Sequence, residues 1–272
     1  MAEFSKTVHH KNKTIGFVPT MGYLHDGHLF LAKQARRDTD VVVMSIFVNP
    51  IQFGAGGDFK KYPRNLRRDI KLAKTAGVDV IFYPQALAMY PKKYRTYINV
   101  ETLDDVLCGR SRPGHFRGVA TVVTKLFNIV QPDIAYFGGK DAQQALIIKK
   151  MTKDLNMPLK IKALPIVRER DGLAMSSRNT YLNAAERKDA LVLYQALKLA
   201  RNLIKNNKKN SSYIIRKMKN LIIKKKTAKI DYIEIVDFND LSPVKKIRDK
   251  VLIALAVWIG KTRLIDNFVL NP

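Results

Sequence analysis

Two histidines close to the start of the chain have the spacing of a phosphate-handling site. The stretch "GFVPTMGYLHDGH" covers residues 16–28 and carries His25 and His28 directly after an apolar run. We expect Asp26 to cap a helix that begins at Gly27, where free backbone N–H groups and the helix dipole favour an anion. The imidazoles would then donate hydrogen bonds to a phosphoryl group that gains charge as a bond breaks.

A second group of polar side chains lies near the middle of the chain. The stretch "RERDGLAMSSRN" covers residues 168–179 and contains Met175-Ser176-Ser177-Arg178. Two hydroxyls, a guanidinium and backbone amides in one loop suit a polyphosphate. Taken alone the loop is a weak signal, because Ser-Ser-Arg segments are common in ordinary loops.

Strands and helices alternate in the part of the chain that holds these motifs. This alternation predicts an α/β fold, a Rossmann-like doubly wound parallel sheet with helices on both faces. Ligands bind such sheets at the carboxyl ends of the strands, which is where both motifs fall. The expected strands are 14–18, 40–48, 78–84, 133–138 and 159–167, and the expected helices are 29–37, 64–77 (stopped by Gly77), 118–130 and 141–155.

The pattern changes after about residue 178. A helix-rich stretch, 184–226, leads to three strand candidates, of which the last two are joined by a tight turn at Gly260-Lys261. We therefore predict two domains, a Rossmann-like domain over 1–175 and a smaller C-terminal α+β domain over 176–272, a lid of helices and an antiparallel sheet. The three candidate strands are 229–237, 250–259 and 262–270.

The chain is strongly basic. Its 272 residues include 49 Lys and Arg against 23 Asp and Glu, a net charge of +26, and the excess is densest over 204–229. That segment reads either as a solvated helix face or as a patch for nucleic acid or another anion. No aromatic interleaving supports stacking on bases, so nucleic acid is not an expected partner.

Composition also limits location and cofactor class. A single cysteine, Cys108, allows no internal disulfide, and with no secretory signal pattern this favours the cytoplasm. No apolar run approaches the roughly 18 residues of a membrane span. G-x-G-x-x-G, the P-loop motif and zinc-type Cys/His spacing are all missing, so no metal ligand is assigned.

Five motifs taken together resemble one enzyme family, the pantothenate synthetases or pantoate–β-alanine ligases. The pairing of H-x-G-H with an M-S-S-R loop is similar to the HIGH and KMSKS signatures of nucleotidylyltransferases. The resemblance covers about residues 14–183 and continues more weakly to the C-terminus. The motifs are "PTMGYLHDGH" (19–28), "MSIFVNPIQF" (44–53), "YPRNLRRD" (62–69), "RPGHFRGVATVVTKLFNIVQPDIAYFGGKDAQQ" (112–144) and "RERDGLAMSSRN" (168–179).

The resemblance implies a reaction in two steps. ATP and (R)-pantoate would give pantoyl adenylate and pyrophosphate, and the amine of β-alanine would then displace AMP to form pantothenate. Mg²⁺ would accompany ATP, and a homodimer is expected from the family alone. A related nucleotidylyltransferase with another acceptor, such as RNA, and a non-catalytic nucleic-acid-binding protein remain alternatives.

The resemblance also implies residue roles. His28 would be the family's proton donor, His25 would contact the phosphates, and Gln52 with Gln144 would hold pantoate. Catalytic roles fall to His25, His28, Lys140, Ser176, Ser177 and Arg178. The ATP site would comprise Met21, Gly22, Tyr23, Leu24, His25, Asp26, Gly27, His28, Gly138, Gly139, Lys140, Asp141, Val167 (by its backbone, to adenine), Met175, Ser176, Ser177 and Arg178. Closure near 170–183 would bring the 175–178 loop over the triphosphate.

Some positions depart from the family pattern or carry no assigned role. Gly139 stands where the family usually has a longer polar residue. The segment before Thr14 lacks the usual leading helix pattern, so we expect a first strand or helix to be absent or rearranged. We assign no function to the pair Arg67-Arg68, which reads as a solvated helix face. His115 lies in a plausible active-site loop, with a binding and a structural role both open.

Overall fold

The computed structural model describes residues 1–54 and 58–271, so part of the glycine-rich run at 54–59 lies outside the described residues. The chain divides into two compact units. The first contains 1–105 and 112–166, and the second contains 106–111 and 167–272. The units thus divide at 166/167, somewhat before the domain boundary that the sequence favours, and that boundary stays a prediction.

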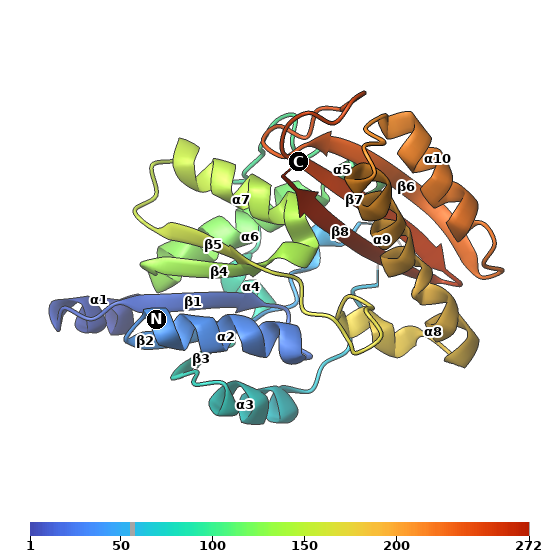
Figure 1. Ribbon diagram of the computed structural model, residues 1–272. Coiled ribbons are helices and arrows are strands. Elements are labelled where there is room, and N and C mark those ends of the chain that lie inside the picture. The colour runs from blue at the N-terminus through green and yellow to red at the C-terminus, as the bar shows by residue number, and fades with distance from the viewer. Residues whose placement is uncertain (55–57, 272) are drawn as a thin grey trace. The chain divides into compact units, whose positions relative to one another are not determined.

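A five-stranded sheet forms the centre of the first unit (Figure 1). Its strand order is β3-β2-β1-β4-β5, and every neighbouring pair is parallel. Apolar, β-branched sequences run through its middle strands, which are buried on both faces as parallel sheets require. The predicted Rossmann-like fold is confirmed. The strands are β1 (Ile15–Thr20), β2 (Val41–Ile46), β3 (Val80–Phe82), β4 (Ile134–Gly138) and β5 (Lys160–Leu164).

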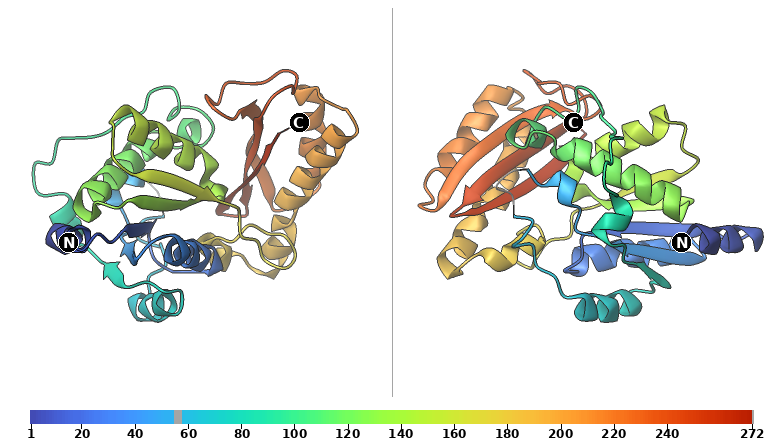
Figure 2. Two further views of the ribbon diagram at one scale, coloured as in Figure 1. Left: turned by 60° about the vertical axis from the view of Figure 1, so that its left-hand side comes forward. Right: turned by 180° about the vertical axis from the view of Figure 1, so that it is seen from behind.

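Helices cover both faces of this sheet, α2 and α3 on one and α6 and α7 on the other, while α1 contacts α6 (Figure 2). The expectation of a missing leading helix is wrong, because α1 forms and its Ser5 hydroxyl donates to the carbonyl of Val130 at 2.6 Å. Gly77 stops α3 as expected, at φ +83°. The helices are α1 (Ala2–His10), α2 (Asp26–Asp38), α3 (Leu66–Thr75), α4 (Ala86–Met89), α6 (His115–Val130) and α7 (Ala142–Asp154), with short 3₁₀ turns η1 (Pro50–Gln52) and η2 (Gly139–Asp141).

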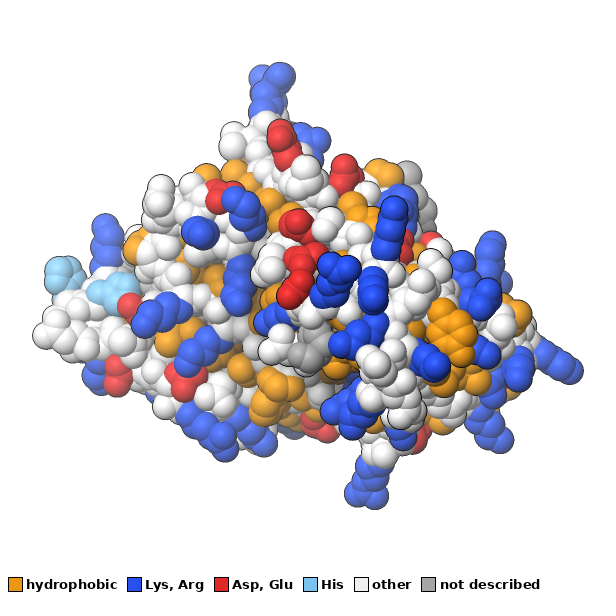
Figure 3. Space-filling model, turned by 45° about the horizontal axis from the view of Figure 1, so that its top comes forward, with side chains coloured by type: hydrophobic (Ala, Val, Ile, Leu, Met, Phe, Trp, Pro, Cys, Tyr) orange, Lys and Arg blue, Asp and Glu red, His pale blue; other side chains and the backbone are white. Residues whose placement is uncertain are grey.

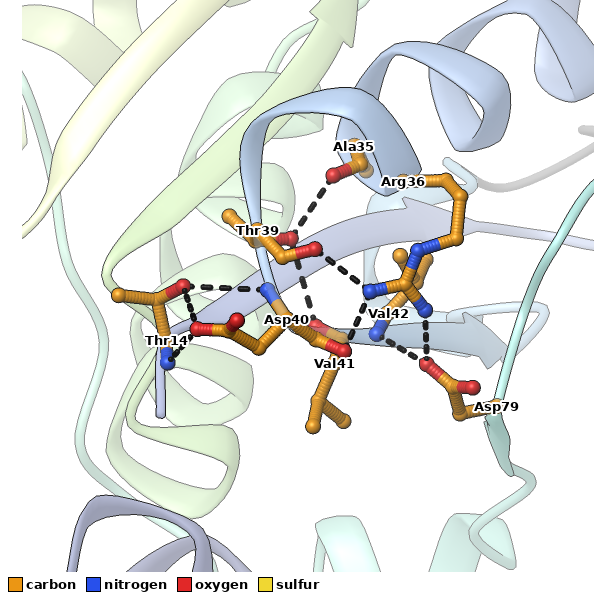
Figure 4. A network of polar contacts seen from close by, with 8 residues as sticks. All are labelled: Thr14, Ala35, Arg36, Thr39, Asp40, Val41, Val42 and Asp79. Atoms are coloured by element: carbon orange, nitrogen blue, oxygen red, sulfur yellow. Dashed lines mark hydrogen bonds and ion pairs between the residues drawn. The ribbon is translucent and has the colours of Figure 1, made fainter. Parts of the chain in front are cut away.

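A polar network closes the edge of the sheet at which β1 and β2 begin (Figure 4). Asp79 accepts from the Arg36 guanidinium and from the backbone of Val42, each at 2.7 Å. Asp40 accepts from both the backbone and the hydroxyl of Thr14 at 2.8 Å. These carboxylates accept hydrogen bonds from the backbone at the amino ends of β1 and β2. This edge of the sheet is therefore used for structure, and the opposite edge, at the carboxyl ends of the strands, is left for ligands.

The second unit is a three-stranded antiparallel sheet of order β6-β7-β8 packed against helices. The tight turn at Gly260 is confirmed, since Ile259 pairs with Thr262 across it. The predicted helix-rich stretch at 184–226 contains three helices. The elements are α5 (Cys108–Ser111), η3 (Ser177–Tyr181), α8 (Ala184–Ala190), α9 (Val192–Lys205), α10 (Ser211–Ile222), β6 (Ala228–Asp237), β7 (Val251–Ile259) and β8 (Thr262–Leu270).

Part of the lysine-rich segment 204–229 lies on the exposed side of an amphipathic helix, α10. In α10 the side chains of Ile214, Met218 and Ile222 are fully buried, while the basic residues between them are exposed. Lys and Arg side chains are spread across the visible face in Figure 3. These observations favour the solvated-face interpretation of the basic segment. In the described part of the chain, no helix is long and apolar enough to cross a membrane.

Candidate active site

The turn after β1 holds its shape because a buried carboxylate captures its backbone. Gly22 and Tyr23 both adopt left-handed conformations, at φ +82° and +50°. Asp69, which is 1% exposed, accepts from the backbone N–H of Tyr23 at 2.7 Å and of Leu24 at 2.8 Å. A Cβ on Gly22 would lie 2.9 Å from Ile46 and 3.1 Å from Asp69. Sequence reasoning missed Asp69, whose single carboxylate in a charged helix gives no signal.

Both arginines beside this aspartate are exposed, as a solvated helix face requires, but Arg68 also contacts the turn. The guanidinium of Arg68 lies 5.0 Å from the centre of the Tyr23 ring, at cation–π distance. Its Nη1 is 3.5 Å from Asp69 Oδ1. Arg68 therefore contacts both the turn and the carboxylate that holds it.

The helix after this turn begins differently from our expectation. His25, not Asp26, is the N-cap, and α2 starts at Asp26. The Nδ1 atom of His25 accepts from the backbone of Gly27 at 3.1 Å, and Nδ1 of His28 accepts from the backbone of His25 at 3.3 Å. The two imidazoles thus replace the Ser and Glu of an ordinary capping box. The N–H groups expected to be free for an anion are in part used within the turn.

This capping arrangement fixes the protonation of both rings. Because each Nδ1 accepts a hydrogen bond, the proton of each neutral ring lies on Nε2. Desolvation, helped by the positive charge of Lys140, lowers the pKa of His25 to about 4. Desolvation, with His25 and Lys140 adding to it, holds the pKa of His28 well below 6.5. Both rings are therefore neutral near pH 7, stacked at a centroid distance of 4.1 Å, and each offers an Nε2–H donor.

A second cluster surrounds Gln52, which lies in η1 just after β2 and is 8% exposed. Its Oε1 accepts from Nδ2 of Asn49 at 3.1 Å, and its Nε2 points to the sulfur of Met21 at 3.1 Å. Its backbone carbonyl accepts from Nδ1 of His115 at 2.9 Å. Gln52 is thereby tied to the 21–28 turn, and His115 has a structural part in its placement.

The loop after β4 supplies the third part. Because β4 is hydrogen-bonded to β1, Gly138 to Asp141 lie at the point where the strand order reverses, the usual ligand site of such sheets. Lys140 Nζ is 3.3 Å from Asp141 Oδ2, and its charge acts on both histidines. A Cβ on Gly139 would lie 2.9 Å from the carbonyl oxygen of Leu164, so the missing side chain matches close packing on β5.

Gln144 lies in the first turn of α7 and is partly exposed. Its neighbour Gln143 is buried and donates to the carbonyl of Leu103 at 2.8 Å. The first unit thus places His25 and His28 after β1, Gln52 after β2, and Lys140 and Gln144 after β4. Since β2 and β4 flank β1, these residues follow three adjacent strands.

The remaining predicted residues belong to the second unit, where they form a braced loop. Met175 donates its backbone N–H to the carbonyl of Val167 at 3.0 Å. The hydroxyl of Ser176 caps η3 by accepting from the backbone of Arg178 at 3.2 Å. Asn179 ties the end of the loop to Glu169 and to the carbonyl of Ala174. Ser177 is buried, while Met175, Ser176 and Arg178 are partly exposed.

The acidic side chains of the described residues offer Mg²⁺ few ligands. Among the described residues, no group of three or more His, Cys, Asp or Glu side chains could hold a metal ion. Mg²⁺ commonly binds through one or two carboxylates plus substrate phosphates, keeping several waters. The carboxylate of Asp141, 47% exposed and next to Lys140, fits that limited demand.

The fold and the turn after β1 define a Rossmann-like α/β protein with a paired-histidine helix start. The family model for pantoate-beta-alanine ligase matches residues 1–269, and the chain belongs to this family. Pantothenate synthetase from Caldicellulosiruptor saccharolyticus is 56% identical over 271 residues, covering 100% of this chain and 96% of the relative. The corresponding protein of Heliobacterium modesticaldum is 57% identical with the same coverage.

Solved structures agree with this assignment. Pantothenate synthetase from Thermus thermophilus superposes with a TM-score of 0.92 at 45% identity, covering 95% of this chain and 94% of the other. Pantoate-beta-alanine ligase from Francisella tularensis, complexed with beta-gamma ATP and beta-alanine, gives a TM-score of 0.80 at 37% identity, covering 98% and 94%.

Proposed function

We propose that the chain catalyses the ATP-dependent condensation of (R)-pantoate with β-alanine to pantothenate, through pantoyl adenylate. The observation that supports this reaction, a ligation that forms a C–N bond, is family membership over residues 1–269. In the first step a carboxylate oxygen of pantoate attacks the α-phosphorus of ATP, a P–O bond breaks, and pyrophosphate leaves. In the second, the amine nitrogen of β-alanine attacks the acyl carbon, loses a proton, and AMP leaves.

The paired histidines act as neutral hydrogen-bond donors in the first step. The capping geometry directs the proton of each ring to Nε2, and the lowered pKa values keep both rings uncharged. His28 thus stabilises charge on the phosphoryl group by donating from Nε2–H rather than by transferring a proton. His25 does the same for the phosphates, as preorganised donors do elsewhere.

The other roles follow the family pattern. Gln52 and Gln144 bind pantoate, and their neutral amides leave its carboxylate nucleophilic. Lys140 offsets the negative charge of the phosphates. The loop Met175 to Arg178 closes over the triphosphate, where the hydroxyls of Ser176 and Ser177 donate hydrogen bonds. The backbone of Val167 contacts adenine. Met21 to Gly27 and Gly138 to Asp141 line the nucleotide. Asp141 would hold Mg²⁺ together with the ATP phosphates, where the ion neutralises charge.

We further propose a cytoplasmic homodimer. The single cysteine is consistent with a reducing compartment. The dimer rests on the family resemblance alone, and light scattering measures it directly.

Pyrophosphate exchange into ATP tests the reaction. Exchange should require pantoate and should proceed without β-alanine, because pyrophosphate leaves in the first step. Exchange without pantoate, or with another acid in preference, would assign the chain a different acid substrate and support a nucleotidylyltransferase with another acceptor.

Two substitutions at one position test the neutral-donor role. His28→Ala should lower the exchange rate by about 10²–10³, the range for loss of one preorganised hydrogen-bond donor. His28→Gln, whose amide N–H can replace the Nε2–H donor, should retain clearly more activity than His28→Ala. Equal losses would contradict a role as neutral donor, and His10→Ala, in the exposed end of α1, is the matched control.

A further inference from the structure

A chain of side-chain amides and a phenol lies behind Gln52 and has no role in the mechanism above. Asn49, only 1% exposed, contacts three groups with its amide. Tyr90 Oη lies 2.8 Å from its Oδ1, while the carbonyl oxygen of Gly118 and Oε1 of Gln52 each lie 3.1 Å from its Nδ2. All four residues belong to the first unit.

The carbonyl group of Gly118 fixes the direction of one hydrogen bond in this row of side chains, and the directions of the others follow from it. The carbonyl oxygen of Gly118 can only accept, so the end of the Asn49 amide that faces it must be the NH₂ group. The oxygen of Asn49 then faces Tyr90, which must donate its O–H. The second N–H of Asn49 needs an acceptor, so Gln52 presents its oxygen to Asn49 and its NH₂ group to the side of Met21.

The phenol is held firmly enough to serve this purpose. The Tyr90 ring packs on Phe47 at 6.3 Å and on Tyr94 at 5.1 Å, and Lys125 lies 5.9 Å from its centre. Burial, with a smaller contribution from Tyr94 and Tyr97, raises the pKa of Tyr90 above its usual value. The hydroxyl therefore keeps the proton that it donates to Asn49.

We propose that Tyr90 and Asn49 are positioning residues that fix the polarity of the Gln52 amide, so that Gln52 only donates hydrogen bonds to the acid substrate. An N–H donor at this position can bind carboxylate and hydroxyl oxygens, whose lone pairs accept the hydrogen bond. It rejects an ammonium group, which can only donate. The hydrogen-bond relay from Tyr90 through Asn49 to Gln52 thereby selects a hydroxy acid over the corresponding amino acid. This inference depends on the proposed contact between Gln52 and pantoate.

The first experiment separates binding by Gln52 from the relay behind it. Gln52→Ala should raise the KM for pantoate while leaving the KM values for ATP and β-alanine nearly unchanged. Tyr90→Phe keeps the ring but removes the hydroxyl that donates to Oδ1 of Asn49. It should raise the pantoate KM by about tenfold. Tyr94→Phe, in the same aromatic group, is the matched control and should change the pantoate KM little.

The second experiment reverses the polarity itself. Gln52→Glu keeps an oxygen for Asn49 and replaces the substrate-facing N–H with an oxygen. The probes are pantoate and its two analogues in which the 2- or 4-hydroxyl is replaced by an amino group, since either hydroxyl can be the one at Gln52. The native chain should discriminate against at least one analogue by about 10² or more in kcat/KM. Gln52→Glu should reduce that ratio by about tenfold or more, because it removes the donor.

The outcomes are distinct. If Gln52→Ala changes the pantoate KM and Tyr90→Phe does not, the relay is wrong while the assignment of Gln52 stands. If Gln52→Ala leaves the pantoate KM unchanged, both are wrong, although pantothenate formation by the native chain still supports the overall function. If Gln52→Glu leaves the discrimination unchanged, the donor polarity of Gln52 is not its source.

Discussion

Replacing Gly118 with alanine should damage the acid site without touching any substrate. Gly118 lies in α6, where η1 packs directly on its Cα. A Cβ at this position would lie 2.6 Å from the carbonyl oxygen of Ile51, and 2.7 and 2.8 Å from Cα and N of Gln52. All three are backbone atoms, so no side-chain rotation relieves the contact. The segment that carries Gln52 must therefore retreat by roughly 0.8–0.9 Å to reach ordinary van der Waals distance.

Two opposing effects set the magnitude. Glycine-to-alanine in a helix interior normally stabilises by about 1 kcal/mol. Overpacking against rigid backbone costs about 1–3 kcal/mol, so we expect a net loss of stability of about 1 kcal/mol. Function should suffer more, because a misplacement of about 1 Å can reduce a rate by about 10². For a shift somewhat below 1 Å, kcat/KM for pantoate should fall by about 10–10².

Pantoate-dependent pyrophosphate exchange measures this loss, and urea unfolding measures the stability change. Gly54→Ala is the matched control, because a Cβ there meets no atom of the described residues within 4 Å and Gly54 lies two residues after Gln52. Normal pantoate kinetics in a folded Gly118→Ala protein would refute the reasoning. It would mean that close packing of η1 on α6 does not position Gln52.

Four further predictions concern the turn and the loop. Asp69→Asn places an NH₂ group against a backbone N–H and should lower the free energy of unfolding by about 2 kcal/mol; an unchanged urea midpoint would contradict this. His25 titrates near 4 when folded but near 6.5 when unfolded, so its contribution to stability is complete above pH 6.5 and falls as pH decreases towards 4. In NMR, neither the His25 nor the His28 ring should titrate between pH 8 and 6, and a midpoint near 6.5 would contradict the assigned neutrality. Saturating ATP should protect the 175–178 loop from proteolysis, and unchanged cleavage would argue against closure.

Much of the fold could be predicted because it depends on local patterns. The run at 40–48 is short, apolar and β-branched, which favours a strand buried on both faces, and β2 forms inside it. The first helix escaped prediction for a physical reason. Only Ser5 and Val8 of α1 are buried, so very few apolar side chains mark the face that docks, and the Ser5 hydroxyl adds a hydrogen bond to Val130 that no sequence pattern reveals.

The candidate site was predictable only where its residues form a sequence motif. His25 and His28 could be found because they follow a strand at short spacing. Asp69 and Tyr90 could not, since each becomes informative only when folding brings it to the Tyr23 backbone or to Asn49. The error at the start of α2 has the same origin, because imidazole is a rare N-cap and an aspartate stands beside it.

The distribution of charge in the first unit suits the difficulty of its first step. In this step a carboxylate must approach a phosphorus whose oxygens are already anionic. A cationic side chain paired with the carboxylate would reduce the nucleophilicity that the step needs. The groups assigned to pantoate are neutral amides, and the two imidazoles are held neutral. The positive charge of Lys140 lies instead in the loop after β4, paired with Asp141. With the proposed roles, neutral donors would face the acid and the cation would face the nucleotide, which would lower the repulsion without weakening the attacking oxygen.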